Sequence, residues 1–221
     1  MPSHKNSFKR IYFSGAVYYV VIKTKNNYPY FKEKIFCDLF IENLKICKQL
    51  KGFKLFAFSI IYDHINLMIE PNNQFNISKI IKSLKENAAR NINIIMGYTL
   101  KQNSPLFVGE TTSFRLRRMR MRLFNLFKGN FEDFYGNKIN IELYKDCFFE
   151  KFGDQNPYSK FKWQISFYDH YIRFHDNHLK KEKDWDYHYD YTVYNHLKHG
   201  LPDNWKYTSL NYPELIDLIE K

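Results

Sequence analysis

Four stretches of the chain are rich in β-branched and aromatic residues, a composition typical of β-strands. The second and third follow each other directly, so Tyr62 and Asp63 are expected to form the tight turn of a hairpin. Pro71 and the two asparagines after it end that hairpin. The predicted strands cover residues 16–24, 54–63, 62–71 and 162–174.

Apolar residues at intervals of three and four predict helices between and after these strands. The clearest helix covers residues 31–50, and Gly52 fits just past its end. A second helix begins at a capping residue, either Asn76 or Ser78, and runs to about residue 98. Two more helices are predicted, one at about 176–199 and a short amphipathic one at 211–221.

The order of elements is strand, helix, strand, strand, helix, insertion, strand, helix. This order predicts the α+β class and the ferredoxin-like (split βαβ) plan, with an antiparallel sheet, two helices on one face and the other face open for a site. An inserted basic helical segment interrupts this core. The predicted division is therefore 1–97 for the first part of the core, 98–160 for the insertion and 161–221 for the rest of the core.

The third predicted strand carries two polar side chains, His64 and Asn66, in the otherwise apolar run YDHINLMIEP. Alternate residues of a strand share a face, so His64, Asn66 and Met68 are expected to point the same way. Such a pair is most often a hydrogen-bonding feature beside a turn. Metal binding becomes the better interpretation only when other parts of the chain supply further ligands.

Three stretches, in this order, resemble one family. His64-Ile65-Asn66 resembles the histidine-hydrophobic-histidine signature of HUH endonucleases. WQISFYDHYIR (163–173) is similar to a block of REP-associated tyrosine transposases, and DYTVYNHLKHGL (190–201) resembles the helix that carries their nucleophilic tyrosine. The resemblance covers about 16–97 and 162–210. It implies an HUH-like catalytic core and metal-dependent cleavage and rejoining of single-stranded DNA through a 5′-phosphotyrosine.

The resemblance places the catalytic nucleophile at Tyr191. A tyrosine hydroxyl is a weak nucleophile until a base, a metal or a positive environment assists it. Asn195 lies four residues later and is expected on the same helical face. The resemblance implies that Asn195, His64 and Asn66 hold the metal cofactor, Mg²⁺ or Mn²⁺.

Asn66 departs from the family, because it stands where the second histidine is expected. An amide oxygen still binds hard cations such as Mg²⁺, whereas metals that prefer imidazole are expected to bind less well. The chain also lacks the proline that follows the family's asparagine, although Asn195 keeps its place. Two functions therefore stay open: an active endonuclease and strand transferase, or a domesticated, catalytically weak or inactive protein that binds structured single-stranded DNA.

Other residues near Tyr191 offer competing interpretations. Tyr194 is the alternative nucleophile, while Tyr187 and Tyr189 are expected to be packing residues. Two histidines of the later blocks could act as bases, but structural hydrogen bonding is the simpler interpretation for them: His170 and His188. Two more are expected to be solvated or to face phosphate: His196 and His199.

The chain is strongly basic, with a formal net charge of +11, which fits a polyanionic partner. Arginines are concentrated in 111–130, and no acidic residue occurs from 111 to 131. The planar guanidinium suits phosphate and guanine, although a solvated face of a packing helix would also explain this segment. The residues expected to contact DNA are Lys82, Lys85, Arg90, Arg115, Arg117, Arg118, Arg120, Arg122 and Arg173.

The expected partner is single-stranded or hairpin DNA, and a homodimer is possible. RNA binding is a weaker alternative, because the aromatic signature of RRM domains is missing. The three cysteines form no CxxC pair, so they suggest neither a disulfide framework nor a zinc ribbon. No signal segment or long apolar run occurs, so the sequence predicts a soluble, cytoplasmic protein with no membrane partner.

Overall fold

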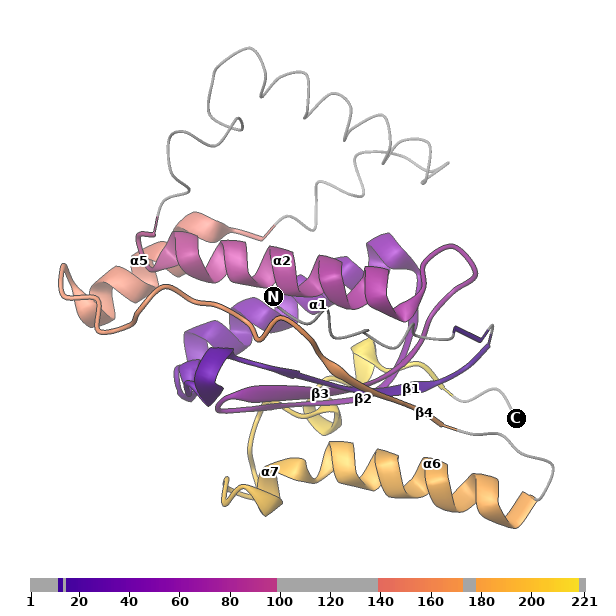
Figure 1. The fold of residues 1–221 in the computed structure, drawn as a ribbon. Coiled ribbons are helices and arrows are strands. Elements are labelled where there is room, and N and C mark those ends of the chain that lie inside the picture. The colour runs from indigo at the N-terminus through magenta and orange to yellow at the C-terminus, as the bar shows by residue number, and fades with distance from the viewer. Residues whose placement is uncertain (1–11, 14, 99–138, 173–177, 219–221) are drawn as a thin grey trace, which may run out of the picture.

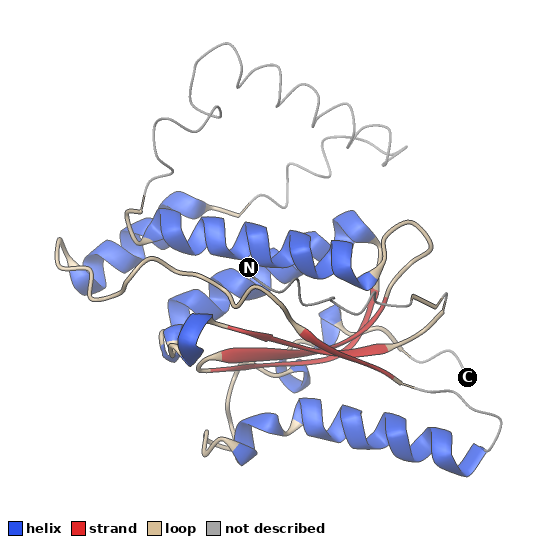
Figure 2. Ribbon diagram, viewed as in Figure 1, coloured by secondary structure: helices blue, strands red, loops and turns tan. Residues whose placement is uncertain are grey.

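The computed structural model describes residues 12–13, 15–98, 139–172 and 178–218, and only the backbone of 178–183. Its centre is an antiparallel sheet in the order β2-β3-β1-β4 (Figures 1 and 2). The predicted ferredoxin-like α+β fold is thereby confirmed. The strands are β1 (Tyr18–Lys23), β2 (Lys54–Ile61), β3 (His64–Glu70) and β4 (Tyr168–Tyr171).

The register of the sheet sorts the side chains of β3 between two layers. Strand β3 lies between β2 and β1, and Asn66 is opposite Val21 of β1. Ile65 and its alternate neighbours enter the main core, whereas Met68 belongs to a smaller apolar cluster on the other face. His64 and Asn66 share that second face, as the period of two requires.

Helices α1 (Lys34–Lys51) and α2 (Ile77–Ile95) cover the first face of the sheet (Figure 1). The cap of α2 is Asn76, whose side-chain oxygen accepts a hydrogen bond from the Lys79 amide. Gly52 ends α1 in the left-handed conformation, with φ of 59°. Both ends therefore follow the sequence expectation.

Helix α5 (Ile141–Phe152) was not predicted from the sequence. Phe148 is its one buried residue and stacks on Phe36 of α1 with ring centroids 5.9 Å apart. With so little of its surface covered, α5 has no clear apolar stripe in its sequence. Residues 99–138, which include most of the expected basic helical segment, lie outside the described residues.

The second face of the sheet is covered by α6 (His178–Val193), with α7 (Asn195–Lys198) directly after it (Figure 1). The expectation of an open second face was wrong. Val193 of α6 is buried in one apolar cluster with Val17 and Met68, and Tyr191 packs at its edge. Burial of this apolar surface is what holds α6 on the sheet.

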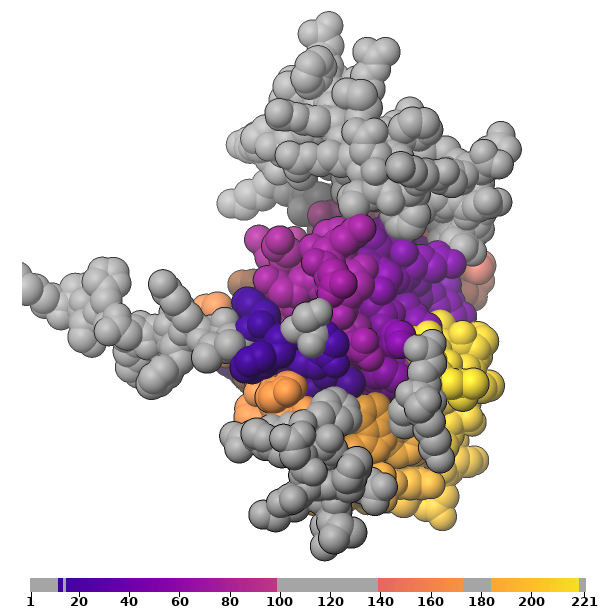
Figure 3. All heavy atoms as spheres, turned by 90° about the vertical axis from the view of Figure 1, so that its right-hand side faces the viewer, coloured from indigo at the N-terminus to yellow at the C-terminus, as the bar shows by residue number. Residues whose placement is uncertain are grey.

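The C-terminal segment does not form the helix expected at 211–221. Within the described residues it contains only short 3-10 turns, and its atoms, yellow in Figure 3, lie against the purple part of the chain. The Ile60 amide donates to the Tyr207 carbonyl at 2.9 Å, and the Asp217 amide donates to the Leu55 carbonyl at 2.9 Å. These bonds satisfy backbone groups of an edge strand, which a helix could not do.

The last strand is also shorter than the predicted 162–174. Before β4, Trp163 forms only an isolated bridge with Thr24, and residues 173–174 lie outside the described part. Along the described chain, every helix is too short or too polar to span a bilayer. The 3-10 turns are Lys25–Asn27, Tyr30–Lys32, Ser209–Asn211 and Pro213–Leu215.

Candidate active site between the sheet and helix α6

One face of the late helical segment presents polar and aromatic side chains to the sheet. Asp184, His188, Tyr191 and Asn195 are spaced by four, three and four residues, the spacing of a single helical stripe. Tyr191 and His188 contact Tyr19 of β1, and Asn195 contacts His64 of β3. The covered face of the sheet is therefore where the predicted site residues meet.

His64 lies at the centre of the first polar group. Its Nδ1 is 2.7 Å from Oδ1 of Asp63, and its Nε2 is 3.2 Å from Nδ2 of Asn195. Asp63 accepts the Nδ1 proton, which leaves the Nε2 lone pair directed at Asn195. The hydrogen bond from His64 also holds the pKa of Asp63 below its ordinary value. The orienting role of Asp63 was missed, because the sequence gives it only as a turn residue.

Asn195 is buried, and its side-chain oxygen has no hydrogen-bond partner among the described residues. Its amide nitrogen donates to Nε2 of His64, so the amide would have to turn its oxygen toward the imidazole before both could bind one cation. A buried oxygen without a donor is costly unless a cation, a water or a ligand satisfies it. A hard cation is one group that would satisfy this oxygen, and the metal-binding role of His64 and Asn195 stays a prediction.

Asn66 is on the same face of β3, but its side chain is engaged elsewhere. Its Oδ1 accepts a hydrogen bond from the Tyr19 hydroxyl at 3.0 Å, and its Nδ2 donates to Ser59 at 3.4 Å. Burial raises the pKa of Tyr19, so this hydroxyl stays a donor. The side-chain oxygen of Asn66 that would bind a metal is thus occupied by Tyr19. His64 contacts Asn195 directly, whereas Asn66 is hydrogen-bonded to other residues.

Replacing Tyr19 with phenylalanine should therefore destabilise the protein and free the oxygen of Asn66. We expect a loss of about 1–2 kcal/mol in unfolding free energy, measured by urea denaturation, because a buried acceptor loses its donor. Tyr18→Phe is the matched control, since the Tyr18 hydroxyl lies on the other face and, among the described residues, accepts a bond from the Phe13 amide. Equal losses for both variants would contradict a specific role for the Tyr19–Asn66 bond.

Tyr191 is half-buried on α6, with its ring edge-on to Tyr19 at a centroid distance of 5.9 Å. The ammonium of Lys198 lies 4.0 Å from the centroid of the Tyr191 ring. A cation at this place would favour a phosphate bound nearby. Sequence reasoning noted Lys198 only as part of a motif and gave it no role. The alternative nucleophile, Tyr194, is exposed at the break between α6 and α7.

The two later histidines of the tyrosine block, expected to be solvated or to face phosphate, differ from each other. His196 is buried, and its Nδ1 hydrogen-bonds the Val193 carbonyl at 3.2 Å, so that prediction was wrong for His196. His199 is largely exposed, but its ring packs against His64 at 4.8 Å. Partial burial, together with the neighbouring His64, lowers the pKa of His199.

The basic residues expected to bind DNA are not part of this polar group. Helix α2 carries Lys82, Lys85 and Arg90 on the opposite side of the sheet from α6 (Figure 1). Lys85 donates to the carbonyls of Gln164, Ile165 and Ser166, so much of its hydrogen-bonding capacity is used within the fold. Their contact with DNA stays a prediction. The remaining arginines lie outside the described residues: Arg115, Arg117, Arg118, Arg120, Arg122 and Arg173.

The fold and site define a class: a ferredoxin-like α+β protein in which a tyrosine-bearing helix meets a polar hairpin strand. Residues 12–105 match the model of a family described as IS200-like transposases. The match includes His64 and Asn66 and ends before the tyrosine helix. This part of the chain is similar to IS200-like transposases, in agreement with the resemblance seen in the sequence blocks.

Two solved structures are similar to this chain. One is a REP-associated tyrosine transposase bound to a REP hairpin, with 14% identity, a TM-score of 0.52, and coverage of 98% of this chain and 92% of that one. This likeness supports the same fold across both parts of the core. The other is a Deinococcus radiodurans protein assigned provisionally as a transposase, with 16% identity, a TM-score of 0.34, and coverage of 56% and 98%. No curated protein sequence matches the chain.

Proposed function

We propose that this protein cleaves and rejoins single-stranded DNA through a covalent 5′-phosphotyrosine at Tyr191. The observation that carries the proposal is the convergence of two segments that are distant in sequence. The buried Asn195, one turn after Tyr191, touches the imidazole of His64 on the hairpin. An ordinary packing helix would have no need to place an orphaned amide oxygen at this point.

The proposed reaction exchanges one phosphodiester for another. The Tyr191 oxygen attacks the scissile phosphorus, a tyrosyl–phosphorus bond forms, and the bond to the 3′ oxygen breaks. The phenol proton passes to solvent or a nearby base, and the departing 3′ oxygen takes up a proton. Lys198, already over the Tyr191 ring, balances the charge of the phosphate. Rejoining is the reverse attack by a 3′ hydroxyl.

A divalent cation is part of this proposal, and the residues present fit one. His64 and Asn195 would hold Mg²⁺ or Mn²⁺, and Asn66 would join them if its oxygen were released by Tyr19. When bound, such a cation would polarise the scissile phosphate. Asp63 contributes by fixing the tautomer and direction of His64.

The proposed substrate is single-stranded DNA beside a hairpin. The similar solved structure is described as bound to a REP hairpin, and the strong positive charge of this chain suits such a polyanion. The predicted arginine segment at 111–130 would supply phosphate contacts beyond the reacting strand. A homodimer remains compatible with this scheme but is not required by it.

The hydrogen bonding of Asn66 favours a second function. Its oxygen is occupied by Tyr19, and β3 carries an asparagine where the family signature has its second histidine, so the protein would bind a catalytic metal more weakly than a site with both histidines. The alternative is a domesticated protein that binds structured single-stranded DNA without cutting it. Salt-sensitive DNA binding would be common to both functions.

A labelled hairpin oligonucleotide with single-stranded flanks separates the two functions. With Mn²⁺, the proposed enzyme should give a covalent protein–DNA band that survives denaturing electrophoresis, and EDTA should abolish it. Binding to the same oligonucleotide is measured in parallel by a mobility shift. Tight binding with no covalent band over a range of hairpin sequences and flank lengths would establish the binding protein instead.

A further inference from the structure

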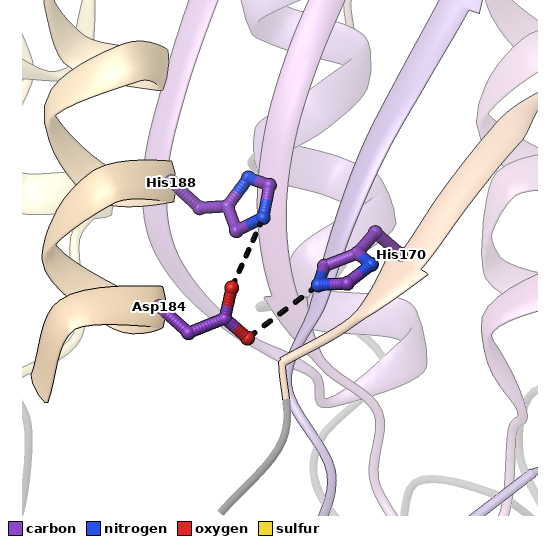
Figure 4. Close-up of side chains that lie close together, drawn as sticks. All are labelled: His170, Asp184 and His188. Atoms are coloured by element: carbon purple, nitrogen blue, oxygen red, sulfur yellow. Dashed lines mark hydrogen bonds and ion pairs between the residues drawn. The ribbon is translucent and has the colours of Figure 1, made fainter. Parts of the chain in front are cut away.

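A second polar group lies at the other end of the same helix stripe. His170 projects from β4, and Asp184 and His188 project from α6 toward it (Figure 4). One donor atom from each side chain can be chosen so that all lie within 4.8 Å of one another, and none of the three is exposed. Among the residues that the structure describes, this is the one group of three or more His, Cys, Asp or Glu side chains this close together.

The distances within this group are unusual for simple hydrogen bonds. Nε2 of His170 is 3.4 Å from Oδ2 of Asp184, and Nε2 of His188 is 3.4 Å from Oδ1 of Asp184. Both exceed the ordinary range of about 2.7–3.2 Å for a nitrogen–oxygen hydrogen bond. The two imidazoles face different oxygens of Asp184, each at about the 3.4 Å that separates neighbouring nitrogen and oxygen ligands of a tetrahedral Zn²⁺ with bonds of about 2.0–2.1 Å.

The surroundings also favour a fixed site. Tyr19 stacks on the His188 ring at 4.7 Å, and the His170 and His188 rings lie 4.7 Å apart. Nε2 of His188 faces Asp184, while its Nδ1, the other ring nitrogen, is buried with no hydrogen-bond partner among the described residues. Two imidazoles and one carboxylate are donors typical of borderline divalent metals.

We propose that His170, Asp184 and His188 form a second metal site, separate from the His64–Asn195 pair, that binds a borderline divalent cation such as Zn²⁺. Asp184 precedes Asn195 by eleven residues, about 16 Å along a helix, so one ion cannot serve both groups. The cation would join α6 to β4 one turn before Tyr191. It would therefore fix the helix that carries the proposed nucleophile.

Cobalt titration of the metal-stripped protein tests this site without any measurement of DNA cleavage. Co²⁺ in a tetrahedral nitrogen–oxygen site gives intense visible absorption, and Zn²⁺ should displace it. We expect one tight equivalent in the wild type and in His64→Ala. Asp184→Asn and His170→Gln should weaken Co²⁺ binding by about 100-fold or more, whereas Asp186→Asn, an exposed carboxylate of the same helix, should not.

Thermal unfolding gives the second readout. Zn²⁺ should raise the melting temperature of the wild type in a concentration-dependent way, with no rise for Asp184→Asn. Circular dichroism confirms that each variant is folded before it is compared. Loss of Co²⁺ binding in His64→Ala with retention in Asp184→Asn would overturn the proposal, and so would millimolar binding alone. Failure here leaves the phosphotyrosine proposal standing, because that proposal is measured by the covalent band.

Discussion

Tyr191→Phe is expected to abolish the covalent protein–DNA band and to reduce strand cleavage by at least about 1,000-fold, the scale on which loss of a nucleophile acts in other covalent enzymes. The phenylalanine keeps the ring that packs beside Tyr19 and under Lys198. Fold stability and binding to the hairpin oligonucleotide should therefore stay close to wild type. Denaturing electrophoresis with Mn²⁺ measures cleavage, and a mobility shift measures binding.

Tyr194→Phe is the matched control for this experiment. Tyr194 is three residues away, exposed, and lies at the break between α6 and α7. Its replacement should leave the covalent band unchanged. If the band persisted in Tyr191→Phe and disappeared in Tyr194→Phe, Tyr194 would be the nucleophile. The proposed class of reaction would still hold.

His64→Ala is expected to lower cleavage by at least about 100-fold and to raise the Mn²⁺ concentration needed for half-maximal activity. Even groups that only orient a metal ligand contribute about 10–100-fold, and His64 would be a ligand itself. The substitution also leaves the amide of Asn195 without its acceptor. Cleavage is followed across a Mn²⁺ titration, with hairpin binding measured alongside.

Asp63→Asn provides a graded comparison. The asparagine oxygen can still accept the Nδ1 proton of His64, but the negative charge beside the imidazole is removed. A smaller loss, about 10-fold, with a shifted Mn²⁺ requirement is expected of a positioning residue. Metal-independent cleavage in both variants would remove His64 from the mechanism.

The core of this fold was predictable because its apolar residues are regularly spaced along the sequence. Strands β1 to β3 and helices α1 and α2 each bury a regular apolar set, so their order alone indicated the ferredoxin-like plan. Helix α5 buries little beyond Phe148, and its pattern is correspondingly weak. The C-terminal segment has a helical pattern, but hydrogen bonds to the edge of β2 determine its conformation instead. Such tertiary bonds leave no periodic signal in the sequence.

The candidate site was predictable only in part. The pairing of His64 with Asn195 follows from two motifs that a family resemblance brings together. The hydrogen bond from Tyr19 to the side-chain oxygen of Asn66 depends on the register between β3 and β1, which the sequence does not specify. The group formed by His170, Asp184 and His188 depends likewise on how α6 crosses the second face. In both cases the sequence does not show which side chains of separate elements lie close together in space.

The stretch that follows α7 has a consequence for the behaviour of shortened proteins. Tyr207 and Asp217 cover backbone groups of β2 that would otherwise form a free sheet edge. A protein truncated before Tyr207 would expose the backbone groups at the edge of β2. Free strand edges readily pair with those of other molecules. Self-association and loss of solubility after such trimming would then reflect intermolecular β-pairing and would say nothing about catalysis.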